Sequence, residues 1–136
     1  MNLKIKLYSF SYLKSGIPAD DSGNGGGFVF DCRYIENPGK LDELKTLTGK
    51  DEKVIKFIED IPAMRNFIKN VIEIIDPAIE NYIKRNFTDL MISFGCTGGQ
   101  HRSVYSSEKI KEHINKKHPG VVVELKHLQL EKDSTA

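Results

Sequence analysis

The chain has 136 residues, of which 39% are hydrophobic and 29% charged, and its formal net charge is +1. This length and composition fit one globular domain with a hydrophobic core, and a charge so close to zero excludes a chain-wide attraction to nucleic acid or membranes. No apolar run is long enough to span a membrane, and no signal-peptide core follows Met1. Two cysteines exclude a disulfide framework and a four-cysteine metal site. We therefore expect a cytoplasmic protein whose ligands bind through a local arrangement of side chains.

The first part of the chain predicts two strands joined by a long loop. Leu3, Ile5 and Leu7 alternate with lysines, which indicates a strand at the edge or the start of a sheet. Residues 15–27 are polar and rich in glycine, as loops are. The apolar run 28–30 indicates a buried strand. A turn at 37–39 and one or two helical turns over 41–47 follow.

The middle of the chain predicts helices separated by prolines. Asp51 can cap a helix with apolar residues on one face, and Pro62 either ends this helix or starts the next. Apolar residues then recur at helical spacing over 64–75. Pro77 predicts a second break.

The last part predicts a buried strand over 90–94, an amphipathic helix over 103–117 and a final strand over 121–125. Strands that alternate with helices predict an α/β fold with a mostly parallel central sheet of about four strands flanked by helices. We expect one domain at 1–130, followed by a flexible tail at 131–136.

The segment between the strand at 90–94 and the following helix has the composition of an anion site. In an open parallel sheet, ligands bind beyond the carboxyl ends of the strands, where this segment would lie. Gly98 and Gly99 allow successive N–H groups to turn inward, and the start of the helix adds free N–H groups and the positive end of its dipole. Arg102 offers a planar fork for a phosphate, and His101 can donate to one. The alternative is a turn with a solvated arginine.

The predicted phosphate site comprises eight consecutive residues, which are Cys96, Thr97, Gly98, Gly99, Gln100, His101, Arg102 and Ser103. Cys96 and Arg102 also satisfy the C-x5-R spacing of protein tyrosine phosphatases, in which a thiolate attacks phosphorus. Gly95 stands where that family usually carries histidine, and no acid loop is apparent, although Asp20, Asp21 or Asp31 could reach the site. A cysteine at a strand end is also often a small apolar filler. A cysteine-dependent phosphatase is therefore the alternative to a non-catalytic binding domain.

A second polar group follows the strand at 28–30 and is expected at the same edge of the sheet. Arg33 could bind a second anionic or hydroxyl group, Asp31 could orient it, and Asn37 lies close behind in the chain. The alternative is a surface ion pair of little energetic value. His113 and His118 have no thiol or carboxylate at ligand spacing, so we expect neither a metal nor a cofactor.

Four ordered blocks resemble the C-terminal domain of the RapZ/YvcJ family: YSFSYLKSGIPADD, FVFDCRYIENPG, LTGKDEKVIKFI and SFGCTGGQHRSVYSSE. The resemblance runs from about Tyr8 to Glu131. It implies a fold akin to a phosphofructokinase subdomain and a phosphosugar site at 96–102, with a ligand such as glucosamine-6-phosphate. It also places Asp31 and Arg33 in an FDxR block. In enterobacterial members this domain binds small regulatory RNAs and presents one to ribonuclease E.

Two departures limit what the resemblance implies. Full-length members carry an N-terminal P-loop domain, but this chain has no G-x-x-x-x-G-K-[ST] motif, so we expect a stand-alone or excised domain without ATP or GTP binding. The family's basic C-terminal segment is altered here by Leu128 and Asp133. The basic residues left for RNA are Lys116, Lys117, Lys126 and His127. We expect weak, salt-sensitive RNA binding from them, unless they are only a solvated surface; a homo-oligomer or a partner protein stays open.

Overall fold

Four segments form one parallel sheet in the computed structural model, which describes residues 2–134. The strands are β1 (Lys4–Ser11), β2 (Phe28–Asp31), β3 (Asp89–Cys96) and β4 (Val122–His127). Their order is β2-β3-β1-β4, and every neighbouring pair is parallel. The predicted α/β class and the predicted mostly parallel four-stranded sheet are thus confirmed.

The positions of β1 and β2 differ from the prediction. β1 pairs with β3 on one side and β4 on the other, so it is an interior strand rather than an edge strand. Ile5 and Leu7 are completely buried while Lys4 and Lys6 are half-buried, because alternate side chains point to opposite faces of the sheet. β2 is an edge strand, and its Val29 is 42% exposed. The alternation of apolar residues and lysines in β1 therefore arises because one face of the sheet is less covered than the other, and not because β1 is an edge strand.

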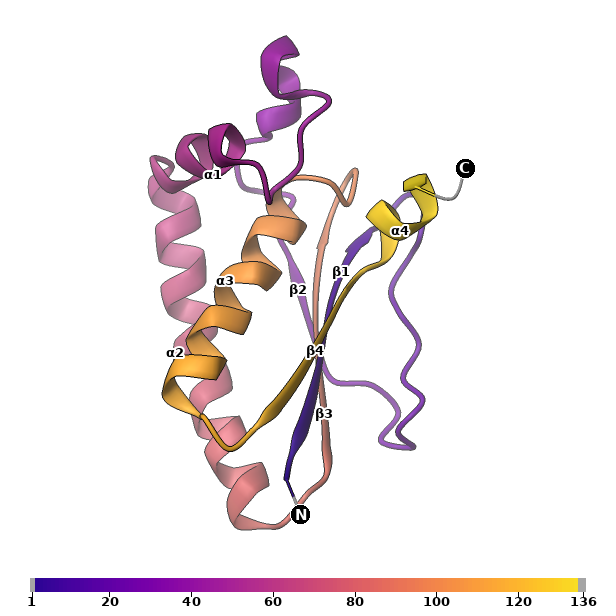
Figure 1. Cartoon of the computed structure of the whole chain (residues 1–136), viewed down its shortest axis with the longest axis vertical. Coiled ribbons are helices and arrows are strands. Elements are labelled where there is room, and N and C mark those ends of the chain that lie inside the picture. The colour runs from indigo at the N-terminus through magenta and orange to yellow at the C-terminus, as the bar shows by residue number, and fades with distance from the viewer. Residues whose placement is uncertain (1, 135–136) are drawn as a thin grey trace.

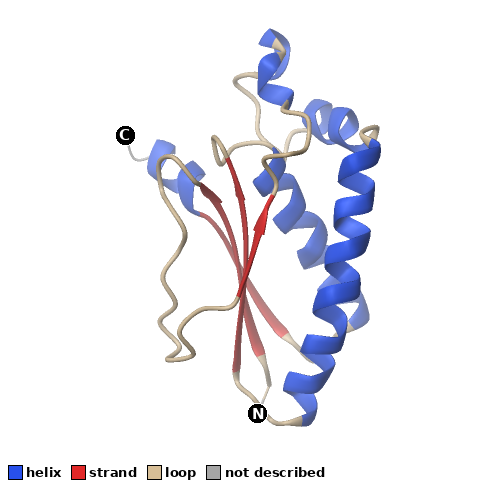
Figure 2. Cartoon of the chain, turned by 180° about the vertical axis from the view of Figure 1, so that it is seen from behind, coloured by secondary structure: helices blue, strands red, loops and turns tan. Residues whose placement is uncertain are grey.

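Two long helices, α2 (Pro62–Lys84) and α3 (Arg102–Lys117), cover one face of the sheet, and α1 (Glu52–Glu59) packs against α2 beyond the carboxyl ends of the strands (Figure 1). The loop 12–27 runs along the other face, as Figure 2 also shows, and α4 (Leu128–Ser134) lies near the carboxyl end of β1. The main core lies between the sheet and the three helices. It includes Ile5, Leu7, Ile92, Phe94, Val71, Ile75, Ile79, Ile110 and Ile114. Burial of each large side chain contributes about 1.5–3 kcal/mol, which fixes α3 across the sheet.

The helix ends correct several predictions. Pro62 is the first residue of α2, but α2 continues through Pro77 to Lys84, so the predicted second break is wrong. Pro77 is exposed, and the carbonyl that loses its N–H partner there can turn to water. Residues 131–134, where a flexible tail was expected, lie in α4, while residues 135–136 lie outside the described residues.

The segment before α1 contains two short 3-10 helices, η1 (Pro38–Lys40) and η2 (Asp42–Leu44), where helical turns were expected. Asp51 occupies the N-cap position of α1, but its Oδ2 accepts from the Thr48 N–H at 2.7 Å instead of capping the helix. Among residues 2–134, no helix is both long enough and apolar enough to cross a membrane.

Candidate functional site

The carboxyl end of β3 is fixed by bonds from both neighbouring strands. The Gly95 carbonyl accepts from the Cys32 N–H at 2.8 Å, and the Cys96 carbonyl accepts from the Tyr12 N–H at 3.0 Å. Ser11 Oγ donates to the Thr97 carbonyl at 2.6 Å, which is a contact that the sequence did not predict. The loop after β3 therefore leaves the sheet from a rigid position.

The two glycines of this loop differ in what the backbone requires of them. Gly99 has a φ of +65°, and a Cβ built on it would lie 2.8 Å from the Gln129 Cβ and 2.9 Å from the Ser11 nitrogen. Gly98 has no such φ, and a Cβ there would meet nothing within 4 Å. The backbone therefore requires glycine at position 99, whereas position 98 has room for a side chain.

The loop ends at the first residue of α3, where backbone donors face the loop. The first helical bond of α3 runs from the Tyr105 N–H to the His101 carbonyl at 2.9 Å. The three preceding N–H groups consequently have no acceptor within the helix. A helix of 16 residues carries a positive partial charge at this end, which favours an anion. Cys96 lies beside it and donates from Sγ to Ser103 Oγ at 3.1 Å.

Arg102 is buried, with 4% of its surface exposed, so it is not the solvated arginine of the alternative interpretation. Its Nη1 donates to the carbonyls of Arg33 at 2.9 Å and Ile35 at 2.8 Å, which ties α3 to the segment after β2. Its Nε is buried and has no hydrogen-bond partner among the described residues. A buried charged group with an unused donor is costly unless a ligand supplies the acceptor.

Gln100 and His101 hold the η2 segment against the loop. Gln100 Nε2 donates to the carbonyls of Lys45 and Leu47, each at 2.7 Å. His101 Nε2 lies 2.9 Å from the Leu44 carbonyl, and it must be the donor because a carbonyl can only accept. Burial lowers the pKa of His101, although its bonds to backbone carbonyls oppose this shift. His101 is therefore neutral at pH 7 and uses its Nε2 hydrogen within the protein, rather than for the phosphate that the sequence suggested.

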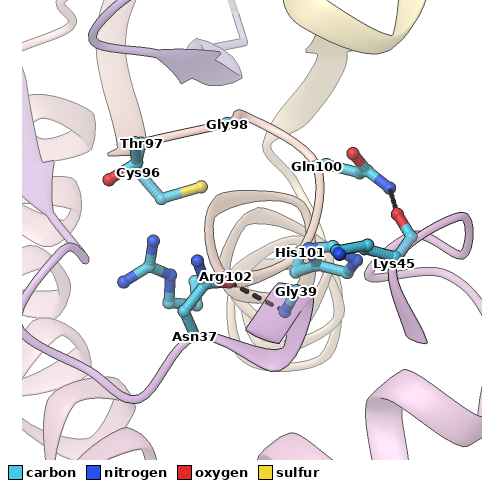
Figure 3. Close-up of a pocket in the computed structure, with 9 residues that line it drawn as sticks. All are labelled: Asn37, Gly39, Lys45, Cys96, Thr97, Gly98, Gln100, His101 and Arg102. Carbon is cyan, nitrogen blue, oxygen red and sulfur yellow. Dashed lines mark hydrogen bonds between the residues drawn. The ribbon is translucent and has the colours of Figure 1, made fainter. Parts of the chain in front are cut away.

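These contacts enclose a cavity of about 210 Å³ between the loop and the 3-10 segment (Figure 3). Its lining residues are Asn37, Gly39, Lys45, Cys96, Thr97, Gly98, Gln100, His101 and Arg102. We call this cavity the loop pocket. Figure 3 shows Cys96 and Arg102 on one side of it and Lys45 on the other. Lys45 and Gly39 were missed by the sequence reasoning, because they reach the pocket only when the 3-10 segment folds over the loop.

Of the second predicted polar group, Asp31, Arg33 and Asn37, only Asn37 lies at the loop pocket. Asn37 lines the loop pocket, and its Oδ1 accepts from the Gly39 N–H at 2.9 Å, which orients the side-chain amide. Asp31 and Arg33 do not line it. Their side chains form an ion pair at 2.8 Å, and the guanidinium lies 3.9 Å from the centre of the Tyr12 ring. The hydrogen bonds from Arg33 lower the pKa of Asp31 despite partial burial. The surface ion pair, given above as the alternative, is what the structure contains.

The four residues predicted to contact RNA do not form one patch. Lys117 Nζ lies 2.9 Å from Asp76 Oδ2. His127 is held between Ser9 Oγ and Glu108 Oε2, each at 2.7 Å. Lys126 precedes His127 on β4 and points to the opposite face of the sheet, while Lys116 lies at the far end of α3. Any RNA contacts from these residues would therefore be made from separate surfaces.

His113 and His118 have a carboxylate beside them in space, although none stands at ligand spacing in the sequence. Asp76 Oδ1 lies 2.9 Å from His113 Nε2 and 3.0 Å from His118 Nε2, and its helix precedes theirs by a strand and a loop. The sequence separation of 37 and 42 residues hid this contact. The helical spacing of apolar residues predicted both helices but could not give the angle at which they pack.

Comparison with known proteins adds three relatives. The family profile described as RapZ C-terminal domain matches residues 3–131. The chain is 38% identical over 128 residues to a nucleotide-binding protein of Thermotoga sp. (strain RQ2), which covers 94% of the chain and 43% of the relative. It is 38% identical over 122 residues to one of Clostridium beijerinckii, covering 90% and 40%. It is 36% identical over 126 residues to a nucleotide-binding protein of Hahella chejuensis, and this match covers 93% of the chain and 42% of the relative. The chain thus spans less than half the length of these curated relatives.

Proposed function

We propose that this chain, which belongs to the family of RapZ C-terminal domains, binds a phosphorylated small molecule in the loop pocket. Membership confirms the resemblance read from the four sequence blocks. The observation that carries the proposal is the Arg102 side chain, which is buried, lines the pocket and keeps an unpartnered Nε. A phosphate oxygen would supply the missing acceptor and compensate the buried charge.

The electrostatics of the loop pocket support an anionic ligand. Arg102 and Lys45 both line it, and among the described residues no aspartate or glutamate does. The start of α3 adds backbone donors and the positive end of the helix dipole. A charge-assisted hydrogen bond from a buried arginine is roughly twice as strong as a neutral one. Phosphate therefore fits this pocket better than a neutral or cationic group does.

The size and lining of the pocket favour a sugar phosphate, and we propose an amino-sugar phosphate such as glucosamine-6-phosphate, the ligand that the family resemblance implies. A cavity of about 210 Å³ suits a small ligand, and the side chains of Asn37 and Thr97 can bond to hydroxyl groups. Among residues 2–134, no phenylalanine or tyrosine lines it to stack on a base. We therefore assign the phosphate of a small ligand, and not a nucleotide base, to this pocket. Without a lining carboxylate, the phosphate should carry more of the affinity than the amine.

The cysteine-phosphatase alternative has less support. Cys96 is 2% exposed and its Sγ is hydrogen-bonded to Ser103, and the Nη1 of Arg102 is already bonded to backbone carbonyls. No described carboxylate lines the pocket to protonate a leaving group. We therefore propose a non-catalytic binding domain.

Calorimetry with glucosamine-6-phosphate, glucose-6-phosphate, glucosamine and inorganic phosphate would test the proposal. We expect binding of the two sugar phosphates, weaker binding of phosphate and none of glucosamine at millimolar concentration. Gly98→Asp places a carboxylate at a position where a Cβ meets no neighbour, so the fold should persist. Repulsion between this carboxylate and the phosphate should weaken binding by at least about tenfold.

Gly98→Asn is the matched control, because it adds a side chain of the same shape without the charge. We expect it to bind sugar phosphates nearly as well as the original chain. Equal losses in both variants would point to steric blocking, and no loss in either would place the ligand elsewhere. Binding of glucosamine with the affinity of its phosphate would contradict a phosphate site. Hydrolysis of an aryl phosphate that disappears in Cys96→Ser would instead establish the phosphatase.

A further inference from the structure

A second polar cluster lies between α2 and α3, at the opposite end of α3 from the loop pocket. It consists of Asp76, His113, His118 and Lys117, and we call it the carboxylate cluster. Asp76 is 6% exposed, and His118, which follows the last residue of α3, is 7% exposed. We propose that Asp76, His113 and His118 form a binding site for one zinc ion, independent of the phosphate site.

The geometry of the three ligand groups is close to that of a zinc site. His113 Nε2 and His118 Nε2 lie 2.9 Å and 3.0 Å from Asp76 Oδ1, and the ligand atoms all lie within 4.8 Å of one another. With zinc–ligand bonds of about 2.0–2.2 Å, tetrahedral ligand atoms are about 3.4 Å apart. The two nitrogen–oxygen separations are thus within about 0.5 Å of this spacing. The remaining separation, between the two imidazole nitrogens, is at most 4.8 Å and has to shorten by no more than about 1.4 Å to accept the ion.

The chemistry of the donors suits zinc better than magnesium or calcium. Two imidazole nitrogens and one carboxylate oxygen form a ligand set that zinc accepts, with a fourth position left for water. Hard cations such as calcium prefer oxygen ligands alone. Asp76 Oδ1 lies within hydrogen-bond distance of both imidazole nitrogens, and Oδ2 lies 2.9 Å from Lys117 Nζ, so the carboxylate is already surrounded by groups that pair with its negative charge.

Two features of the surroundings also favour a cation here. The cluster sits at the carboxyl end of α3, where the helix dipole is negative. Lys117 Nζ already lies 2.9 Å from Asp76 Oδ2, so an ammonium group occupies part of the cation's place. The Lys117 side chain is 52% exposed and can swing into solvent, and the nearby Glu80 adds negative charge. Lys117 is therefore a competitor of zinc and not a ligand.

Zinc at this site would link α2 to α3 and stabilise the folded chain. The three ligands come from α2, from α3 and from the residue that follows α3, which the unfolded chain does not hold together, so the ion binds the folded state preferentially. The chelator-treated chain should bind one equivalent of zinc in a calorimetric titration and melt at a higher temperature with zinc than without. Cobalt used as a probe should give the visible absorption of a four-coordinate nitrogen and oxygen site.

Ligand variants should remove this binding. We expect His118→Gln and Asp76→Asn to lower zinc affinity by more than the roughly 10–100-fold that loss of an outer-shell partner costs. Lys117→Met should raise the affinity at least about threefold, because it removes the competing ammonium while retaining the aliphatic stem. Lys116→Met is the matched control. It is the preceding residue, it lies outside the cluster, and the affinity should stay unchanged.

The Lys117→Met variant keeps the proposal falsifiable even if the ligand variants fold poorly. An affinity that does not rise in this variant would overturn the competition with zinc. Absence of stoichiometric binding to the original chain would show that the cluster is an ion-pair network only. A sulfur-to-cobalt charge-transfer band would place the metal at Cys96 or Cys32, and would overturn the assignment too. None of these outcomes depends on whether the loop pocket binds phosphate.

Discussion

The two ends of α3 carry polar groups of opposite character. At the amino end, the loop pocket presents backbone donors, Lys45 and the buried Arg102, whose Nε has no partner in the described part of the chain. At the carboxyl end, Asp76 accepts bonds from Lys117, His113 and His118. The amino end keeps one buried donor unused, the Nε of Arg102, and the carboxyl end has a carboxylate surrounded by donors that a cation could replace. The signs match the helix dipole, which favours anions at the amino end and cations at the carboxyl end.

The two ends of α3 also differ in what holds them together. The pocket end is shaped by the backbone, with Gly99 and the carbonyls that hold Arg102, so its polar side chain remains partly available to a ligand. The cluster end is satisfied by its own side chains and joins two helices without any ligand. We therefore expect substitutions that alter the backbone to destabilise the loop pocket most, and substitutions that alter charge to destabilise the carboxylate cluster most.

The largest effect should come from Gly99→Ala. The new Cβ would lie within 3 Å of Gln129 and Ser11 in a backbone conformation that alanine rarely adopts, so we expect a loss of about 3 kcal/mol in the free energy of unfolding. Gly98→Ala, at the adjacent open position, should change it by less than about 0.5 kcal/mol. Denaturant unfolding of both variants measures the difference. Similar values for the two would mean that the loop does not depend on its backbone shape.

Asp76→Asn should cost about 2 kcal/mol at neutral pH in the metal-free chain. The pKa of Asp76 is about 2 in the folded state, below its unfolded value of about 3.9, so its contribution is complete above pH 4 and is lost as the pH falls through 2. Unfolding measured between pH 7 and pH 2 should show this loss in the original chain and not in the variant. Glu73→Gln, an exposed position on the same helix, is the control and should preserve the pH dependence.

Gln100→Ala should have a smaller effect of about 1–2 kcal/mol, because its side chain makes two bonds to the carbonyls of Lys45 and Leu47. Amide hydrogen exchange should rise locally at residues 45–49, as the 3-10 segment loses its attachment to the loop. Gln100→Glu has the same shape but no donor, and should cost more than the alanine change. If exchange is unaltered in both variants, the segment is held by other contacts.

RNA binding should give the smallest effect. Lys116 and Lys126 lie on separate surfaces, so we expect weak RNA binding. Lys116→Glu or Lys126→Glu should reduce the dependence of affinity on salt concentration by no more than the equivalent of about one phosphate contact. Their effects should add, since they share no partner. Gel-shift titrations at two salt concentrations measure both quantities. Tight binding that ignores salt, or a strong coupling between the two positions, would indicate one continuous RNA site.

The sequence predicted those parts of the site that follow one another in the chain. A strand, a glycine-rich loop and a helix gave the position of Cys96 to Arg102, and the structure places Asn37 beside them. The sequence could not predict which side-chain hydrogen-bond donors would bond to other groups of the protein. Gln100 and His101 bind backbone carbonyls of a segment more than 50 residues away, and Arg33 turns to Asp31. Partner choice for such long side chains depends on distances that only folding sets.

Local patterns alone determined the fold class, the four strands, the helix over 103–117 and the family. These follow from apolar periodicity and from motifs read along one stretch of chain, which local geometry dictates. The tertiary structure decided the strand order, the inclusion of Lys45 in the loop pocket and the meeting of Asp76 with His113 and His118. The physical reason is that packing brings these groups together by burying apolar faces. The angle and register of that packing depend on side chains throughout the core, and no short segment encodes them.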